Sequence, residues 1–317
     1  MGLKERFRGA LLGTFIGDAL GMPVEGMDYK SIEEKFGQVR EMLNGRLQKG
    51  SYTDDTQMMI GVAESLHKNS GFCGEDMSNC FAENFSAERG YGRSTATIIE
   101  EIKKGAKWNE VGEIVFKGGS LGNGAAMRSA PIGLYYYDNL DELITVGKEA
   151  AQITHAHRLG YEGAILISLG VAFALRYRSL DEFSAKERFI RSIQKAYPFS
   201  KEYLNAFDKI LQLLRRRKLS RNEVISNLGV SVKAHESVPV SLYAFLRNTN
   251  SFEEAVVYAV NLGGDTDTIG AMTGSLAGAY HGCRMIPERW LNDLEDGEKG
   301  KNYVIQLADL LYEKIEI

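Results

Sequence analysis

Two series of regularly spaced glycines constrain the fold of this chain more than any other feature. At about 3.6 residues per turn, residues four apart share one face of a helix, so each series leaves that face without side chains. A glycine inside a helix costs about 1 kcal/mol relative to alanine, and close approach of a second helix is the usual compensation. We therefore expect two closely packed helices, which carry Gly9, Gly13, Gly17 and Gly21, and Gly270, Gly274, Gly278 and Gly282.

The composition places these glycines inside a folded domain. The 317 residues include 34 Gly but only 5 Pro and have no Gly-x-y period, which excludes collagen and Pro/Gly-rich linkers. The same spacing of small residues occurs in paired membrane helices, but Asp18, Thr268 and His281 add polar groups to these segments. We therefore expect packed helices of a globular protein and no stable membrane insertion.

Hydrophobic periodicity is helical over nearly the whole chain. The segment Leu134-Tyr135-Tyr136-Tyr137 is a short candidate strand, and no Gly/Ser-rich linker or charge block divides the sequence. We therefore expect a single all-α domain over residues 1–317, built as a bundle of many helices. The predicted helices cover residues 3–20, 56–68, 75–88, 93–104, 107–116, 140–154, 159–177, 181–196, 201–216, 221–228, 236–248, 252–261, 267–283 and 300–315.

Charge and cysteine content narrow the classes of function. The chain has 38 basic and 42 acidic residues and a net charge of -4, which gives no electrostatic reason to expect nucleic-acid binding. Cys73, Cys80 and Cys283 have no Cys-x-x-Cys spacing, so neither a disulfide framework nor a zinc site is indicated. With no apolar leader segment at its start, the chain is expected in a reduced, cytoplasmic compartment.

Two similar acidic clusters carry the strongest chemical signal. Each directly precedes a predicted helix, and each combines two acids with threonines: Thr53-Asp54-Asp55-Thr56 and Asp265-Thr266-Asp267-Thr268. Helix N-capping explains one such side chain for each helix but not two acids in both clusters. Carboxylates and hydroxyls are hard ligands that suit Mg²⁺ or Mn²⁺, with Ca²⁺ as an alternative. Four acids would neutralise two divalent cations, which predicts a binuclear site.

Three further segments are candidates for substrate contact. The glycine-rich segment Gly118–Gly124 could present backbone N–H groups to a phosphate, with an ordinary loop as the alternative. His155 and His157 are two residues apart and do not share a helix face, so only one is expected to contact a ligand. Glu25 follows a helix-ending proline and is a candidate base, with a solvated loop residue as the alternative.

Taken together, these motifs resemble the ADP-ribosylglycohydrolase family, in family order from about residue 5 to 285. The resemblance implies an orthogonal all-α bundle with two Mg²⁺ or Mn²⁺ ions at the base of an ADP-ribose cleft. It implies as metal ligands Thr53, Asp54, Asp55, Asp265, Asp267 and Thr268. It implies as substrate-binding residues Ser120, Leu121, Gly122, Asn123, Gly124 and His155. It also implies as catalytic residues Glu25, Asp55 and Asp267, of which the first matches a mobile glutamate of one branch.

The implied function is hydrolysis of the N- or O-glycosidic bond between ADP-ribose and its acceptor. The acceptor would be an ADP-ribosylated protein side chain or the acetyl group of O-acetyl-ADP-ribose. An arginine-specific branch has an additional acid near the position of Gly90–Ser94, where this chain has none, so the acceptor stays open. The alternatives are a non-catalytic ADP-ribose-binding or crystallin-like structural member, and a hydrolase of another ribose or phosphate metabolite.

Overall fold

The computed structural model describes residues 2–315 and is built from helices alone over that span. The all-α prediction is thereby confirmed. The elements in the described part of the chain are α1 (Leu3–Gly21), α2 (Tyr29–Phe36), α3 (Asp54–Asn69), α4 (Gly74–Asn84), α5 (Arg93–Lys103), α6 (Ala130–Tyr135), α7 (Leu140–Gln152), α8 (Arg158–Arg176), α9 (Phe183–Ala196), α10 (Lys201–Arg215), α11 (Arg221–Leu228), α12 (Ala234–Arg247), α13 (Phe252–Val260), α14 (Thr266–His281), α15 (Glu288–Asp293) and α16 (Lys301–Ile315), with short 3-10 turns at Met22–Val24, Ala87–Arg89, Val111–Glu113 and Cys283–Met285.

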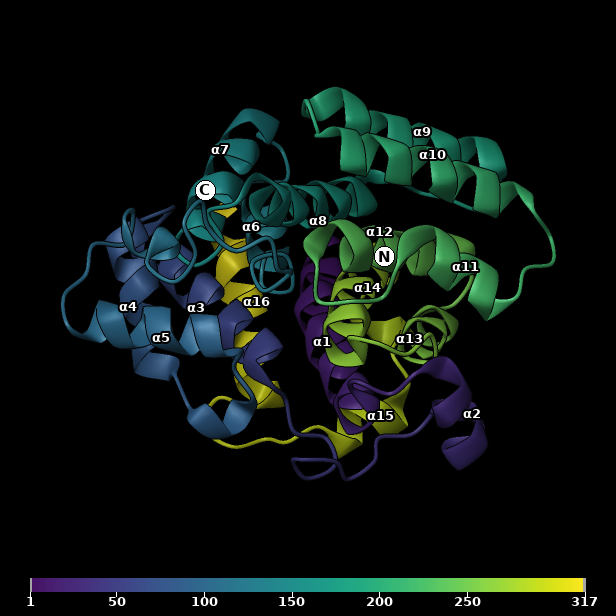
Figure 1. Cartoon of the computed structure of the whole chain (residues 1–317), viewed down its shortest axis with the longest axis horizontal. Coiled ribbons are helices and arrows are strands. Elements are labelled where there is room, and N and C mark those ends of the chain that lie inside the picture. The colour runs from purple at the N-terminus through teal and green to yellow at the C-terminus, as the bar shows by residue number, and fades with distance from the viewer. Residues whose placement is uncertain (1, 316–317) are drawn as a thin grey trace.

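The two glycine-bearing helices, α1 and α14, lie side by side at the centre of the molecule (Figure 1). Their glycines meet in reverse order along the two helices. An added Cβ on Gly17 would lie 2.0 Å from the carbonyl oxygen of Gly270, and an added Cβ on Gly9 would lie 2.3 Å from the carbonyl oxygen of Gly278. No side chain fits between backbones at this separation. The predicted close packing of the two glycine series is therefore confirmed, and the two helices run antiparallel.

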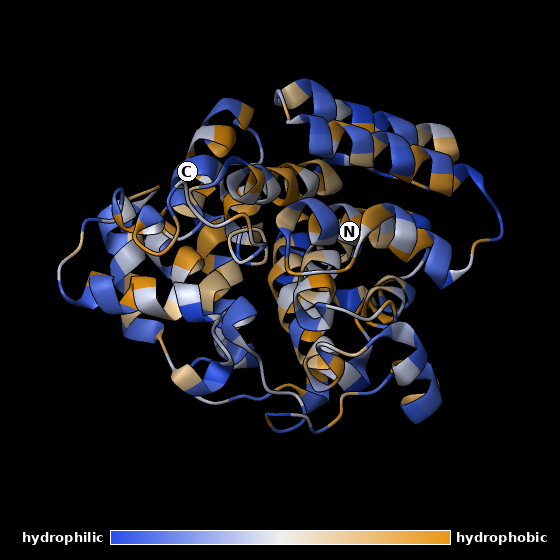
Figure 2. Ribbon diagram, viewed as in Figure 1, coloured by the Kyte–Doolittle hydropathy of each residue, from blue (hydrophilic) through white to orange (hydrophobic). Residues whose placement is uncertain are grey.

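One hydrophobic core surrounds this central pair and extends under most of the outer helices. Outer helices such as α9 and α10 alternate polar and apolar residues, whereas α8 is largely apolar (Figure 2). The length and composition of α8 would allow it to cross a membrane, but 78% of that apolar stretch is buried inside the fold. A buried apolar helix of this kind is what a core position requires.

The structure corrects three local predictions. Residues 107–116 do not form an α-helix; only Val111–Glu113 form a 3-10 turn, where the backbone at Gly112 packs against the carbonyl oxygen of Gln152. The predicted strand Leu134–Tyr137 is instead the end of α6 and the turn after it. The sequence reading also missed α2, although the Asp28 side chain caps that helix by accepting the N–H groups of two residues in its first turn.

Candidate functional site

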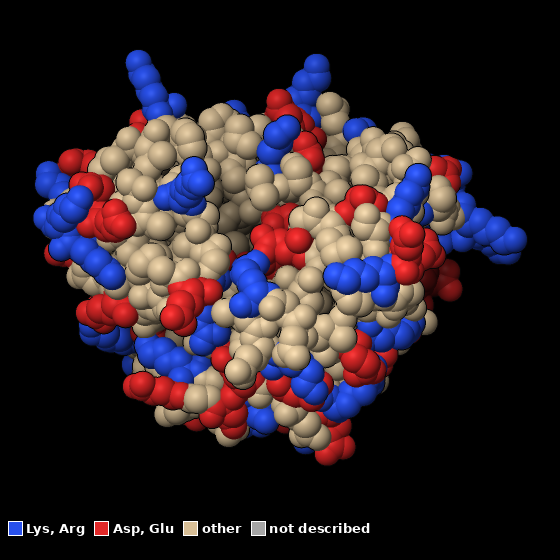
Figure 3. All heavy atoms as spheres, turned by 60° about the horizontal axis from the view of Figure 1, so that its bottom comes forward, with Lys and Arg blue, Asp and Glu red and all other residues tan. Residues whose placement is uncertain are grey.

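A cavity of about 540 Å³ brings together almost all of the predicted site residues. Its walls come from the starts of α3, α5 and α14 and from the loops around residues 25, 120 and 232. Figure 3 shows a hollow in the corresponding face with acidic atoms along one side. The cavity is lined by Glu25, Asp54, Asp55, Gly90, Gly92, Ser94, Thr95, Phe116, Gly119, Ser120, Leu121, Gly122, Asn123, Gly124, Met127, His155, Val232, Asp265, Asp267 and Thr268.

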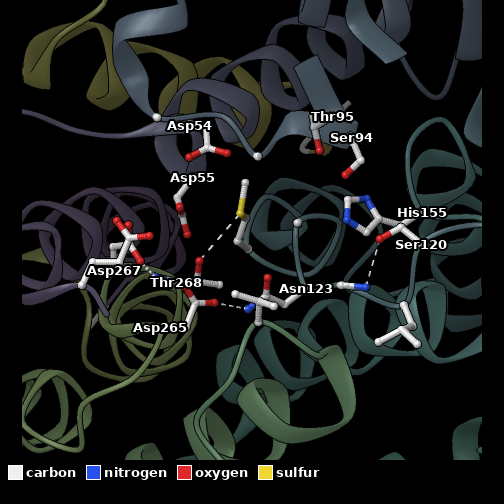
Figure 4. A pocket seen from close by; sticks show the side chains of 18 of the residues that line it. Asp54, Asp55, Ser94, Thr95, Ser120, Asn123, His155, Asp265, Asp267 and Thr268 are labelled. Carbon is white, nitrogen blue, oxygen red and sulfur yellow. Dashed lines mark hydrogen bonds between the residues drawn. The ribbon is translucent and has the colours of Figure 1, made fainter. Parts of the chain in front are cut away.

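The two acidic clusters face each other at one end of this cavity (Figure 4). Asp55, Asp265 and Asp267 are each at least nine-tenths buried. One carboxylate oxygen from each of Glu25, Asp265 and Asp267 lies within 4.8 Å of the others. That separation is close to twice the ~2.1 Å metal–oxygen distance of Mg²⁺, so a small shift would let the three acids share one ion.

Thr53 is the predicted ligand that does not line the cavity. Its buried hydroxyl donates to Oδ2 of Asp55 at 3.1 Å and accepts the Asp55 N–H at 3.4 Å. Thr268, by contrast, lines the cavity, and its N–H donates to Oδ1 of Asp267 at 2.9 Å. The two threonines therefore orient the neighbouring acids in this structure.

The loop that carries Glu25 is held against the start of α14 by backbone hydrogen bonds. The Gly26 N–H donates to the carbonyl oxygen of Gly264, and the Gly264 N–H donates to that of Met27, both at 2.8 Å. Gly263 and Gly264 both have φ of +78°, a conformation that side-chain-bearing residues rarely adopt. This pairing places Glu25 beside the second acidic cluster although the two are far apart in the sequence.

Arg46 is a charged residue beside the acidic cluster that no sequence motif predicts. Its guanidinium forms an ion pair with Glu25 and lies 3.5 Å from Oδ2 of Asp267. It also packs over Gly90, where an added Cβ would lie 2.5 Å from one of its nitrogens. Arg46 belongs to an irregular segment between α2 and α3, so no helical pattern marks it in the sequence.

Burial and mutual repulsion make this acidic cluster unfavourable when it carries its full negative charge. Burial, reinforced by Asp267, raises the pKa of Asp54 to about 8 and that of Asp265 to about 7. Burial also raises the pKa of Asp55 and Asp267 above the usual range for a carboxyl, although the Arg46 guanidinium opposes the shift of Asp267. Bound cations would remove this repulsion and favour the ionised acids.

The cluster also contains an unpaired ligand atom that fits a metal ion. Oδ1 of Asp55 is buried and has no hydrogen-bond partner among the described residues. A buried carboxylate oxygen without a partner is costly unless an ion or water satisfies it. The donor set is oxygen-only, which is the chemistry that Mg²⁺ and Mn²⁺ prefer. The residues present therefore fit the cation site that the sequence predicts.

The glycine-rich loop forms the opposite end of the cavity and offers free backbone donors. In the part of the chain that is described, the N–H groups of Ser120, Leu121 and Gly124 have no hydrogen-bond partner. The N–H of Gly122 is instead taken by the Ser120 hydroxyl at 3.2 Å, and that of Asn123 by the carbonyl oxygen of Val232 at 3.0 Å. Free N–H groups on such a loop suit an anionic group such as a phosphate.

Asn123 links this loop to the acidic cluster. Its side-chain amide donates to Oδ2 of Asp265 (Figure 4) and, at 2.9 Å, to the hydroxyl of Ser237. Both the amide and the backbone N–H of Asn123 are therefore engaged within the protein, although the residue lines the cavity. In this structure its contacts orient Asp265.

His155 lies against the loop as a buried, neutral ring. Its Nδ1 lies 2.7 Å from the hydroxyl of Thr154, and an added Cβ on Gly124 would lie 2.7 Å from its Cε1. Burial, reinforced by Arg128, lowers the pKa of His155 to about 3, so the imidazole is neutral at physiological pH. His155 therefore lies beside the glycine-rich loop, whereas His157 begins α8 by accepting the Leu159 N–H.

The cavity wall contains apolar residues near its mouth and no Lys or Arg among the described residues that line it. Three of the lining side chains are large, hydrophobic and exposed: Phe116, Leu121 and Val232. The donors that the lining residues offer to a substrate phosphate are therefore uncharged backbone N–H and hydroxyl groups, which bound cations would supplement. The apolar rim is suited to a flat, uncharged group such as a nucleobase.

The fold is all-α, with buried carboxylates at one end of a cavity and a loop with free N–H groups at the other, an arrangement suited to an enzyme that acts on a phosphate-containing substrate. The family model for ADP-ribosylglycohydrolase matches residues 1–316. The chain belongs to this family, and it is an enzyme that hydrolyses the glycosidic linkage of ADP-ribose. The resemblance noted in the sequence is therefore confirmed.

Individual relatives agree with this assignment. The chain is 34% identical to ADP-ribosylhydrolase ARH3 of Homo sapiens, over 93% of this chain and 90% of the human protein. It is 33% identical to ARH3 of Bos taurus, over 93% of this chain and 90% of the bovine protein. A solved structure described as an ADP-ribosylglycohydrolase-related protein complex has a TM-score of 0.76 and 31% identity, and the match covers 98% of both chains.

Proposed function

We propose that this chain releases ADP-ribose from ADP-ribosylated protein side chains with the help of two divalent cations, Mg²⁺ or Mn²⁺. The observation that carries the proposal is the placement of a buried acidic cluster and a loop with free N–H groups in one cavity. The proposed cation ligands are Thr53, Asp54, Asp55, Asp265, Asp267 and Thr268.

The charge balance of the cavity supports the need for cations. A diphosphate is strongly negative, and the described lining residues include four aspartates and Glu25 but no Lys or Arg. Placing both in a partly buried cavity without counter-ions would be strongly repulsive. When bound, two divalent cations would polarise ribose hydroxyls and lower the pKa of a water molecule. Their identity as Mg²⁺ or Mn²⁺ is proposed from the oxygen-only donor set.

The remaining steps fall to residues of the chain itself. The free N–H groups of Ser120, Leu121 and Gly124 bind the diphosphate, and the rim residue Phe116 packs against the adenine. These contacts fix the anomeric carbon of the second ribose near the acidic cluster, with neutral His155 beside the loop. Orientation of this kind is a major part of catalysis.

Glu25 is proposed as the residue that moves the proton. It is the exposed acid of the cluster and sits on a loop, with 36% of its side chain accessible. It accepts a proton from the attacking water as the water oxygen bonds to the anomeric carbon. The bond from that carbon to the acceptor breaks with its electron pair going to the acceptor, and the proton held by Glu25 is passed to the acceptor, so Glu25 is restored and the net reaction consumes one water.

A panel of substrates tests this proposal. ADP-ribose is measured chromatographically after incubation with arginine-linked peptide, serine-linked peptide and O-acetyl-ADP-ribose, for the wild type and Glu25→Ala. We expect release from at least one protein-linked substrate and its loss in the variant. Tight ADP-ribose binding without turnover would favour a non-catalytic reader. Turnover confined to other small metabolites would favour a different hydrolase.

We also propose that the enzyme acts in the reducing cytoplasm. All three cysteines, Cys73, Cys80 and Cys283, are free thiols in the structure, which supports that setting. Transfer of the protein into an oxidising buffer should not increase its activity, because no disulfide is required.

A further inference from the structure

We propose that Asp18 is a positioning residue that caps the N-terminus of α3 from the neighbouring helix α1 and so leaves Asp54 and Asp55 free to hold cations. This inference rests on the proposed two-cation centre. Asp18 does not line the cavity. It acts on the site through the backbone of α3.

Asp18 is fully buried, and its carboxylate receives hydrogen bonds only from the start of α3 among the described residues. The Thr53 N–H lies 3.0 Å from both carboxylate oxygens. The Thr56 N–H lies 3.1 Å from Oδ2, and the Thr56 hydroxyl donates to the same oxygen at 2.6 Å. One side chain of α1 therefore binds both ends of the first turn of α3.

This arrangement adds to the usual capping of a helix. The N–H groups of a first turn lack partners inside the helix, and a side chain at the N-cap normally accepts one from the second or third helical residue. In α3 the third helical residue is Thr56, and its N–H goes to Asp18 instead. The N-cap residue Thr53 accepts only a long bond of 3.4 Å from Asp55.

The consequence is that the two acids in the first turn of α3 are not needed as caps. Among the described residues, the Asp54 side chain has no hydrogen bond to another residue, and Oδ1 of Asp55 is buried without a partner. Both residues line the cavity (Figure 4). A carboxylate supplied from another helix thus satisfies the helix N-terminus while the helix's own carboxylates face the cavity.

The position of Asp18 is fixed by the glycine packing around it. It lies between Gly17, whose added Cβ would sit 2.0 Å from the carbonyl oxygen of Gly270, and Gly21, whose added Cβ would sit 2.5 Å from the backbone nitrogen of Asp267. The same stretch of α1 therefore contacts the backbone that carries the second acidic cluster and caps the helix that carries the first. Asp18 and its neighbouring glycines therefore hold the first acidic cluster in place relative to the second.

The test is Mn²⁺ affinity, measured by electron paramagnetic resonance titration of the purified full chain. Asp18→Asn keeps the size of the side chain but leaves one acceptor oxygen for three donors. We expect its Mn²⁺ affinity to fall about 10–100-fold, the range typical of residues that support metal ligands. The matched control is Thr14→Val, one turn earlier in α1, where the hydroxyl bonds only the Ala10 carbonyl of its own helix. This control should bind Mn²⁺ as the wild type does.

A second pair of variants keeps the test decisive if Asp18→Asn does not fold. Thr56→Val removes one donor to Asp18 and should weaken Mn²⁺ binding about tenfold, whereas Thr56→Ser keeps the hydroxyl and should restore it. Wild-type affinity in both Asp18→Asn and Thr56→Val would overturn the positioning role. Failure of the wild type to bind Mn²⁺ is a different result, because it would overturn the cation centre itself.

Discussion

The backbone of Gly274 in α14 lies directly against that of Gly13 in α1, so that an added Cβ on Gly274 would sit 2.0 Å from the Gly13 carbonyl oxygen. This contact belongs to the central helix pair (Figure 1). The two helices bring Asp18 and the second acidic cluster to the same end of the pair. The glycines are therefore part of the scaffold that assembles the site.

The first prediction concerns this packing. Gly274→Ala should destabilise the protein by about 1–3 kcal/mol, because the helices must separate to admit a methyl group. The sign of the change in unfolding free energy distinguishes the two cases, since the same substitution in a helix without a close neighbour would stabilise it by about 1 kcal/mol. Denaturant unfolding measures the effect. Gly297→Ala is the control, as an added Cβ there meets nothing within 4 Å. A Gly274→Ala protein as stable as this control would contradict the account, and Gly274→Leu should be more damaging still.

The second prediction is that the acidic cluster lowers the free energy of unfolding of the metal-free protein. Asp55→Asn removes a buried carboxyl whose ionisation is opposed by burial and by the neighbouring acids, so in EDTA it should unfold at a higher temperature than the wild type. The gain should be about 1–2 kcal/mol. Added Mn²⁺ should stabilise the wild type but not the variant. Thermal unfolding with and without Mn²⁺ checks both parts, and a variant that is less stable in EDTA yet still stabilised by Mn²⁺ would refute the prediction.

The third prediction is the pH dependence of the metal-free protein. The pKa of Asp54 is raised from 3.8 to about 8, and that of Asp265 from 3.8 to about 7. From the unfolded pKa of 3.8 up to these raised values, the folded state therefore holds more protons than the unfolded state. Stability must then fall as the pH rises through this window. Because cations bind the ionised acids, Mn²⁺ affinity should rise over the same range.

Unfolding in EDTA from pH 5 to about 8.5, with Mn²⁺ titrations at each pH, measures both trends. Asp54→Asn is the matched variant and should show a shallower loss of stability with pH. A metal-free wild type whose stability rises steadily through this range would show that the acids are not the dominant titrating groups.

The fourth prediction separates chemistry from binding at Glu25. Glu25→Gln should lower kcat by about 10²–10⁴, because the amide cannot accept a proton. ADP-ribose affinity should change little, since the glycine-rich loop is untouched. The control is Glu34→Gln on the exposed face of α2, which should retain full activity. Equal kcat in the wild type and Glu25→Gln would remove Glu25 from the reaction.

The sequence predicted the parts of this structure that depend on local pattern. The glycine series predicted the α1–α14 pair because bare helix faces need a close neighbour, and Gly13 and Gly274 meet as that argument requires. The cap at Asp28 was readable in principle, but α2 is short and amphipathic only over two turns. The aromatic run ending at Tyr137 suggested a strand, although the run instead ends α6, whose Gly133 packs against α8, and continues into a turn.

The site was predictable to the extent that its residues form dense motifs. Asp54, Asp55, Asp265 and Asp267 stand in two such motifs, and the cavity unites them. Arg46 and the capping role of Asp18 could not be predicted, because both depend on tertiary contacts across segments far apart in the chain. Asp18 did leave one signal, the only charged residue in the largely apolar, glycine-rich stretch from Gly9 to Gly21.

The most direct test of the account is ADP-ribose release from a protein-linked substrate by the full chain, after removal of metal with EDTA and again after addition of Mg²⁺ or Mn²⁺. We expect release to stop in EDTA, to return with added metal, and to be lost in Asp267→Ala under both conditions. Full release by the wild type in EDTA would contradict the account.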